Sequence, residues 1–151
     1  MNAILLALHL LAVTAWVGGM FFALVVLRPS LVVLEPRARL ALHRQVFRRF
    51  FLVVWHAMPV TILSGLGMVW TVYGGFAQAS PWVHLMALGG IVMAGIFIAA
   101  VFRPWRELKA ALDDGDAARA VAAVDRVRRL VQINLGLGVI TIVFAALAAA
   151  A

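Results

Sequence analysis

Four long apolar stretches divide the chain. Residues 3–27, 50–73, 82–102 and 131–151 contain no Asp, Glu, Lys or Arg. Each stretch reaches the roughly 20 residues that a helix needs to cross the hydrocarbon core of a bilayer. A single segment in lipid has to satisfy its own backbone hydrogen bonds, and a helix does this without a partner segment. The pattern therefore predicts an all-α fold, a transmembrane four-helix bundle.

The charged residues lie in two connectors between these stretches, 28–49 and 103–130. The first contains six of the thirteen Lys and Arg residues and the second contains seven, and all six acids lie there too. Two spans separate the connectors, so both lie on one side of the membrane, and the positive-inside rule makes that side cytoplasmic. The sequence thus predicts a single membrane domain, 1–151, in the bacterial inner (cytoplasmic) membrane, with both termini periplasmic or extracellular (N-out, C-out).

Composition agrees with a membrane protein. The chain is 66% hydrophobic and 13% charged, whereas the apolar share of a soluble domain is nearer one half. The first span lacks a basic leading region and is longer than a signal-peptide core, so we expect it to be retained. There is no cysteine, which excludes disulfides and thiolate metal sites. Orientation and contact with anionic lipid headgroups account for the net charge of +7, so no nucleic-acid partner is expected.

The first and third stretches resemble each other. A histidine, His9 in the first and His84 in the third, stands nineteen residues before an Arg-Pro pair, and eight of 21 aligned positions are identical. Each copy continues into a basic connector with two adjacent arginines and then into another span. The chain therefore reads as two parallel helical-hairpin repeats, related by a pseudo-two-fold axis along the membrane normal. Spans one and three would then lie diagonally opposite each other.

This symmetry makes the two histidines the candidate site. An ionisable residue inside a span is costly, so function is its default explanation. We expect His9 and His84 to face each other at one depth in the outer half of the membrane and to ligate one haem b from both sides. Trp16 would pack against the macrocycle, and Gly19 would help to open space for it. The structural alternatives are a histidine that donates to a nearby carbonyl and glycines that only let helices approach.

The expected role of such a haem protein is electron transfer or haem-assisted oxidoreduction, which leaves a haem-dependent oxidoreductase activity open. Its partners would be the lipid bilayer, a redox partner or quinone, and a second copy in a homo-oligomer. All six acids lie in the connectors, and no nucleophile with a base or phosphate-binding loop is present. A hydrolase or transferase site is therefore not expected.

Copper is the alternative ligand. Imidazole and thioether groups suit Cu(I), and Met86 and Met93, seven residues apart, share one face of span three. They would bind copper together with His9 and His84, although methionine is also a common filler of apolar gaps. His56 has no counterpart in the other repeat, and we expect it to pair with Asn134 or Gln132. His43 is expected to be solvated.

Several segments resemble the copper resistance protein D (CopD) family of bacterial membrane proteins. They are His9 with Trp16-Val17-Gly18-Gly19, Arg28-Pro29, Phe47-Arg48-Arg49-Phe50-Phe51, His84-Leu85-Met86, and Arg128-Arg129-Leu130 running to Asn134. The resemblance implies copper uptake or tolerance at the inner membrane. The first span is also similar to that of HemJ-type protoporphyrinogen oxidases, which share the pattern His-x6-Trp-x2-Gly, here His9, Trp16 and Gly19. That similarity implies haem b ligation through His9.

Overall fold

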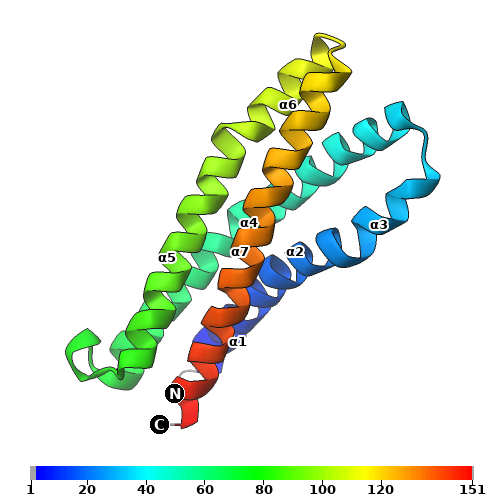
Figure 1. Ribbon diagram of the computed structural model, residues 1–151. Helices are drawn as coiled ribbons and strands as arrows, with labels where there is room; N and C mark the ends of the chain where they lie inside the picture. Colours follow the sequence, from blue (N-terminus) through cyan, green and yellow to red (C-terminus); the bar gives the residue numbers. More distant parts are fainter. Residues whose placement is uncertain (1–2, 151) are drawn as a thin grey trace.

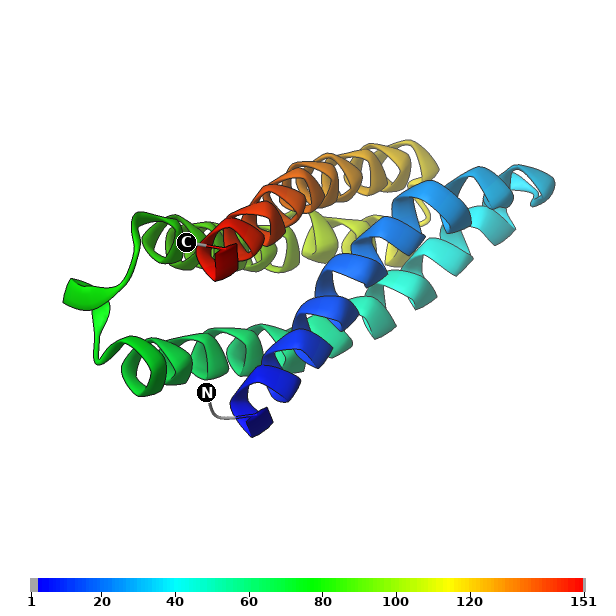
Figure 2. The ribbon, with the colours of Figure 1, turned by 90° about the horizontal axis from the view of Figure 1, so that it is seen from below.

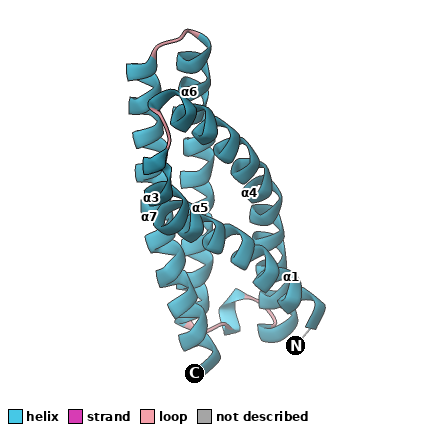
Figure 3. Cartoon of the chain, turned by 90° about the vertical axis from the view of Figure 1, so that its right-hand side faces the viewer, coloured by secondary structure: helices cyan, strands magenta, loops and turns pink. Residues whose placement is uncertain are grey.

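The computed structural model describes residues 3–150, and these residues form helices joined by short turns (Figures 1 and 3). The elements in chain order are α1 (Ala3–Val13), η1 (Thr14–Gly18), α2 (Gly19–Phe21), η2 (Phe22–Leu27), α3 (Arg28–Ser30), η3 (Leu31–Val33), α4 (Pro36–Tyr73), η4 (Phe76–Gln78), α5 (Pro81–Phe102), α6 (Pro104–Asp113) and α7 (Ala117–Ala150). The elements η1 and η2 are π-helical, with i→i+5 bonds, and η3 and η4 are 3₁₀ turns.

Four helical stretches are long and apolar enough to cross a membrane, Ala3–Val33, Pro36–Tyr73, Pro81–Asp113 and Ala117–Ala150. The prediction of an all-α, multi-pass membrane protein is confirmed. Large apolar side chains such as Leu11 and Leu63 are about 70% exposed, as expected where a helix faces lipid rather than water. Ala151, the last residue of the predicted fourth span, lies outside the described residues.

The basic connectors continue the helices instead of forming loops. Helices α4 and α7 each begin fourteen residues before the apolar stretch that they contain, at Pro36 and Ala117. The chain folds into two antiparallel hairpins: α1 packs along α4, and α5 and α6 pack along α7. Both hairpin turns lie at one end of the molecule, and the two termini lie near the other end with the turn between α4 and α5 (Figures 1 and 2). The hairpin order is therefore as predicted, while the two-fold axis and the sidedness stay predictions.

Aromatic side chains pack where the two hairpins meet. Phe51 lies edge-on to Phe97, with ring centroids 5.9 Å apart, and to Trp105, at 5.6 Å. Trp16 from the first span also meets Phe97 edge-on, at 6.4 Å. Such pairs add about 0.5–1.5 kcal/mol each beyond the area that they bury. These rings therefore hold span one and α4 against α5 and α6.

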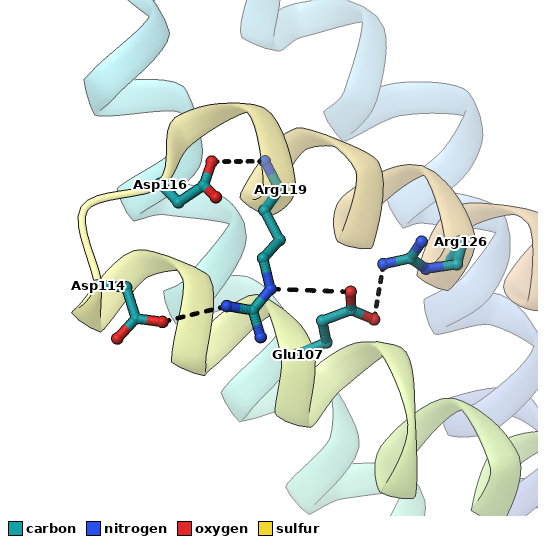
Figure 4. Close-up of polar contacts among 5 residues, drawn as sticks. All are labelled: Glu107, Asp114, Asp116, Arg119 and Arg126. Atoms are coloured by element: carbon teal, nitrogen blue, oxygen red, sulfur yellow. Dashed lines mark hydrogen bonds and ion pairs between the residues drawn. The ribbon is translucent and has the colours of Figure 1, made fainter.

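The turn of the second hairpin is closed by a helix stop and a helix cap. Gly115 has a φ of 74°, a backbone conformation that glycine adopts without steric cost. The Asp116 carboxylate accepts a hydrogen bond of 3.0 Å from the backbone N–H of Arg119 (Figure 4), which satisfies a free donor in the first turn of α7. In the sequence, the run from Asp113 to Asp116 breaks the helical pattern and predicts Gly115 as a helix stop and Asp116 as an N-cap, as the structure has them.

Ion pairs hold α6 against α7 behind this turn. The Arg119 guanidinium lies 3.1 Å from Asp114 and 3.9 Å from Glu107, and Arg126 lies 2.6 Å from Glu107 (Figure 4). The first hairpin turn has no such pairs among the described residues. There, Arg39 donates hydrogen bonds to the carbonyl oxygens of Leu31, Val32 and Leu34.

Candidate functional site

A cavity of about 210 Å³ lies inside the bundle and is walled by all four spans. It occupies the half of the molecule that carries the termini, since its lining includes residues of α1 and of the C-terminal part of α7. Most of the lining is aliphatic, and the side chains with a nitrogen, oxygen or sulfur atom are His9, Trp16, Thr61, Met86, Met93 and Thr141. Four of these six, His9, Trp16, Met86 and Met93, are site residues that the sequence predicts.

His9 is held in one orientation by the second span. Its Nδ1 atom lies 2.9 Å from the carbonyl oxygen of Thr61 and 3.1 Å from the hydroxyl oxygen of Ser64. A carbonyl oxygen only accepts hydrogen bonds, so Nδ1 carries the proton and donates it. Nε2 then keeps its lone pair. Histidine ligands of metals usually have this arrangement, in which the far ring nitrogen donates to a carbonyl or carboxylate.

A glycine on α4 lets the imidazole lie directly against the backbone. A Cβ atom at Gly65 would lie 3.1 Å from Cε1 of His9, closer than most carbon–carbon contacts. Next along the face of the first span is Trp16, which is only 2% exposed. Its indole forms the wall of the cavity toward the connectors, so His9 and Trp16 bound the same space.

Span three contributes two thioethers to the cavity. Met86 and Met93 both line it, as their spacing of seven on α5 predicts. Met93 is 3% exposed, and its methyl carbon would meet a Cβ atom at Gly138 at 3.1 Å. The hydroxyl oxygen of Thr61 is buried and has no hydrogen-bond partner. The wall therefore combines an imidazole, two sulfur atoms and an unpaired hydroxyl in an otherwise apolar setting.

His84 is not at this cavity. It is exposed, its Nδ1 atom donates to the carbonyl oxygen of Ser80 at 3.0 Å, and its ring packs on Phe76 with centroids 5.6 Å apart. Because a helix advances about 100° per residue, His84 lies about 200° around α5 from Met86. The structure therefore places only one of the two predicted imidazoles at the cavity, and the ligation of one haem by both stays a prediction.

Gly19 also lies away from the cavity. A Cβ atom there would lie 2.8 Å from Cε2 of Phe50, so this glycine allows the first span to approach α4. That is the structural alternative for the glycines, helix contact without a cofactor.

The expected pairing of His56 with Asn134 or Gln132 is wrong. His56 is exposed, and its Nδ1 atom donates to the Leu52 carbonyl oxygen at 2.8 Å, one turn back on its own helix. Asn134 is 3% exposed, and its Oδ1 atom has no partner. The His56 side chain points outward and reaches the carbonyl one turn back on its own helix, whereas Asn134 faces the core. His43 also differs from expectation, because it is partly buried and packs on Phe47 at 5.4 Å.

Sequence reasoning missed the residues that position His9. Thr61, Ser64 and Gly65 belong to span two, which has no counterpart of His9 to draw attention to it. The signal for them was the pair of small residues Ser64 and Gly65 within an apolar span, one helical turn from Thr61. No group of three or more His, Cys, Asp or Glu side chains able to hold a metal ion occurs within residues 3–150. The cavity lining offers one imidazole, that of His9, together with the thioethers of Met86 and Met93.

Comparison with known proteins places these residues in a family. The family model "Copper resistance protein D" matches residues 44–148, which include the cavity residues of α4, α5 and α7 but not His9. An uncharacterized protein of Aquifex aeolicus (strain VF5) is 30% identical over 111 residues, which is 73% of each of the two chains. No solved structure matches the chain. The chain thus belongs to the copper resistance protein D (CopD) family of membrane proteins.

Proposed function

We propose that this protein binds Cu(I) in the cavity between its four spans and takes part in copper uptake or tolerance at the inner membrane. One observation carries the proposal: His9 donates through Nδ1 to Thr61 and shares a cavity with Met86 and Met93. This leaves the Nε2 lone pair available as a ligand in a cavity that two thioethers also line. Copper is the cargo here, and imidazole and thioether are the ligand types that Cu(I) accepts.

The lack of acidic side chains in the spans favours a monovalent ion in the cavity. All six acids of the chain lie in the connectors, so the ligands offered within the spans are neutral. The cost of moving an ion out of water rises steeply with its charge, and neutral ligands do not offset it with an opposite charge. Cu(I) therefore suits this site better than a divalent metal ion.

A route toward the connectors would pass beneath Trp16. A space of about 10 Å³ lies there, lined by Met20, Asn134 and the aromatic cluster, which is about the size of one water molecule. Met20 is 1% exposed, and the Oδ1 atom of Asn134 is buried without a partner. These two side chains are the next sulfur and oxygen atoms that an inward-moving ion would meet. If the positive-inside rule holds, this direction leads from the periplasm to the cytoplasm.

The test is Cu(I) binding by the purified full-length protein, measured anaerobically by competition with a Cu(I)-specific chelator. We expect about one Cu(I) per chain, and His9→Ala and Met93→Leu to weaken binding by about tenfold or more. The matched controls are His56→Ala and Met58→Leu, which remove the same groups away from the cavity lining and should bind as the unmodified protein does. Equal loss in the control variants, or binding that survives His9→Ala, would contradict the proposal.

The absorption spectrum of the same preparation tests the haem reading. A red protein whose Soret band disappears in both His9→Ala and His84→Ala would indicate haem held by both histidines and would replace copper binding in this cavity. A colourless protein that binds Cu(I) through His9 but not through His84 supports the proposal. Cellular copper content, compared between cells that express the unmodified protein and the His9→Ala variant, then tells whether binding leads to uptake.

A further inference from the structure

A second and larger groove, of about 560 Å³, lies at the opposite end of the molecule. It runs between the first hairpin and the beginning of α7, where the two hairpins diverge (Figure 1). Its walls are mainly apolar, with Leu24, Leu27, Leu40, Phe47, Phe50 and Val124 among them. The groove shares none of its lining with the copper cavity, so what binds there is a separate question from the proposed function.

Cationic side chains gather at this groove. Arg28, Arg39 and Arg128 line it together with His43, and the one acid in the lining is Asp125. Asp125 lies 2.9 Å from Arg128. Within the described residues, neither Arg28 nor Arg39 has a carboxylate within 4.0 Å. The Nε atom of Arg128 is buried and has no hydrogen-bond partner. The groove therefore combines an apolar wall with guanidinium groups that have unused donors.

The excess of positive charge follows from how acids are distributed between the connectors. The first connector, 28–49, has six basic residues and one acid, whereas the second, 103–130, has seven basic residues and five acids. In the second connector, Glu107, Asp114 and Asp125 form ion pairs with arginines of the same connector. The first connector makes one such pair among the described residues, between Arg44 and Asp113 at 2.8 Å. Among the described residues, its other arginines have no carboxylate partner; Arg39 donates through Nε and Nη2 to three carbonyl oxygens of the turn, and its Nη1 is left for an outside anion.

We propose that this groove binds an anionic phospholipid, with the phosphate at Arg28, Arg39 and Arg128 and an acyl chain along the apolar wall. A guanidinium group binds a phosphate through two parallel hydrogen bonds, and basic pockets between transmembrane helices bind anionic headgroups. The basic connectors belong at the headgroup level of the membrane, and the lining of the groove continues from them to Leu24 and Phe50, which belong to the apolar spans. A free phosphate ion would use the arginines but leave the apolar wall uncovered.

Native mass spectrometry of the detergent-solubilised full-length protein tests this site. Phosphatidylglycerol and phosphatidylcholine with identical acyl chains are titrated in parallel, each with and without inorganic phosphate. We expect phosphatidylglycerol to bind at least tenfold more tightly than phosphatidylcholine, and the double variant Arg28→Gln/Arg128→Gln to lose most of that preference. The matched control is Arg48→Gln/Arg49→Gln, which removes two exposed arginines of the same connector that do not line the groove, and it should keep the preference.

The other possible results of this experiment also test the lipid site. Equal binding of the two lipids, or equal loss in the control variant, would overturn the proposal in favour of diffuse surface charge. Displacement of phosphatidylglycerol by inorganic phosphate at equal concentration would show a free-anion site in place of a lipid site. If the double variant does not fold, the single variant Arg28→Gln, at an exposed position, has to show a smaller loss of preference. None of these results depends on copper, so failure here leaves the proposed function untouched.

Discussion

The two hairpins of this protein share one sequence pattern but pack differently at their turns. In the second hairpin, α6 lies tightly against α7, and Leu108, Ala111, Ala120, Ala123 and Val127 are completely buried there. In the first hairpin, the corresponding turn is held by Arg39, and a groove opens beside it. Alanines at the α6–α7 contact let the two backbones approach, and Glu107 and Asp114 form ion pairs with arginines of α7 around it. The same fold unit can therefore close in one copy and stay open to a ligand in the other.

The two histidines show the same divergence at the opposite end. His9 donates to a carbonyl of a neighbouring span, whereas His84 donates to a carbonyl of its own helix start. The first arrangement ties the imidazole to a second helix and leaves it at a cavity, while the second leaves the imidazole exposed. An internal repeat thus identifies candidate residues, but their neighbours decide which copy can bind a ligand.

The largest expected effect comes from the closed contact of the second hairpin. Leu108→Ala removes a completely buried side chain and should lower the free energy of unfolding by about 3 kcal/mol. Leu40→Ala, at a partly buried position of the first hairpin, should cost clearly less. Thermal unfolding of both variants in the same detergent measures the difference, and equal destabilisation would mean that the two hairpins are packed alike.

The next effect separates the two histidines. His9→Ala should weaken Cu(I) binding by about tenfold or more, and His84→Ala should change it by less than about twofold, because His84 does not line the cavity. Chelator competition measures both. If the two variants lose affinity equally, the histidines act as a pair, as the repeat alone suggested.

A smaller effect is expected at the helix caps. Asp116→Ala removes the hydrogen bond to the N–H of Arg119 and should cost about 1 kcal/mol of stability. Glu35→Ala is the control at the first hairpin, since Glu35 makes no side-chain cap to α4, and it should have little effect. Chemical unfolding monitored by circular dichroism gives both values.

The smallest expected effect tests the contact between His9 and α4. Gly65→Ala would bring a Cβ atom to 3.1 Å from the imidazole, so the ring has to move by a few tenths of an ångström. We expect Cu(I) affinity to fall severalfold with stability unchanged. Gly136→Ala, where a Cβ atom meets nothing within 4 Å, should bind copper normally. Unchanged affinity in Gly65→Ala would indicate that the orientation of His9 does not matter for binding.

The sequence predicted what depends on local pattern. Charge-free length predicted the four spans, and Gly115 with Asp116 predicted the second turn, because stops and caps act on adjacent backbone groups. Helical spacing also predicted that Met86 and Met93 share one face of α5, and both line the same cavity. The hydrogen-bond partner of His9 could not be predicted, because it is the backbone carbonyl of Thr61 and every residue has a backbone carbonyl. Its selection depends on how closely two helices pack.

The pairing of His56 failed for a related reason. The prediction compared only how far His56 and Asn134 lie along their spans, and this distance does not fix the direction in which a side chain points. His56 faces outward and Asn134 faces the core. The groove at the first hairpin could not be predicted either, since it depends on the angle between the two hairpins.

The π-helical turns of the first span explain why equal spacing did not give equal geometry. Two such turns, η1 and η2, lie between His9 and Arg28, while α5 is α-helical over the matching residues from His84 onward. Each π turn rotates the backbone by a smaller angle per residue than an α-helix does. The nineteen residue steps from the histidine to the arginine therefore cover a different total rotation about the helix axis in the two copies. Counting residues therefore aligns the two repeats along the chain, but it does not predict the angular position of each side chain around its helix axis.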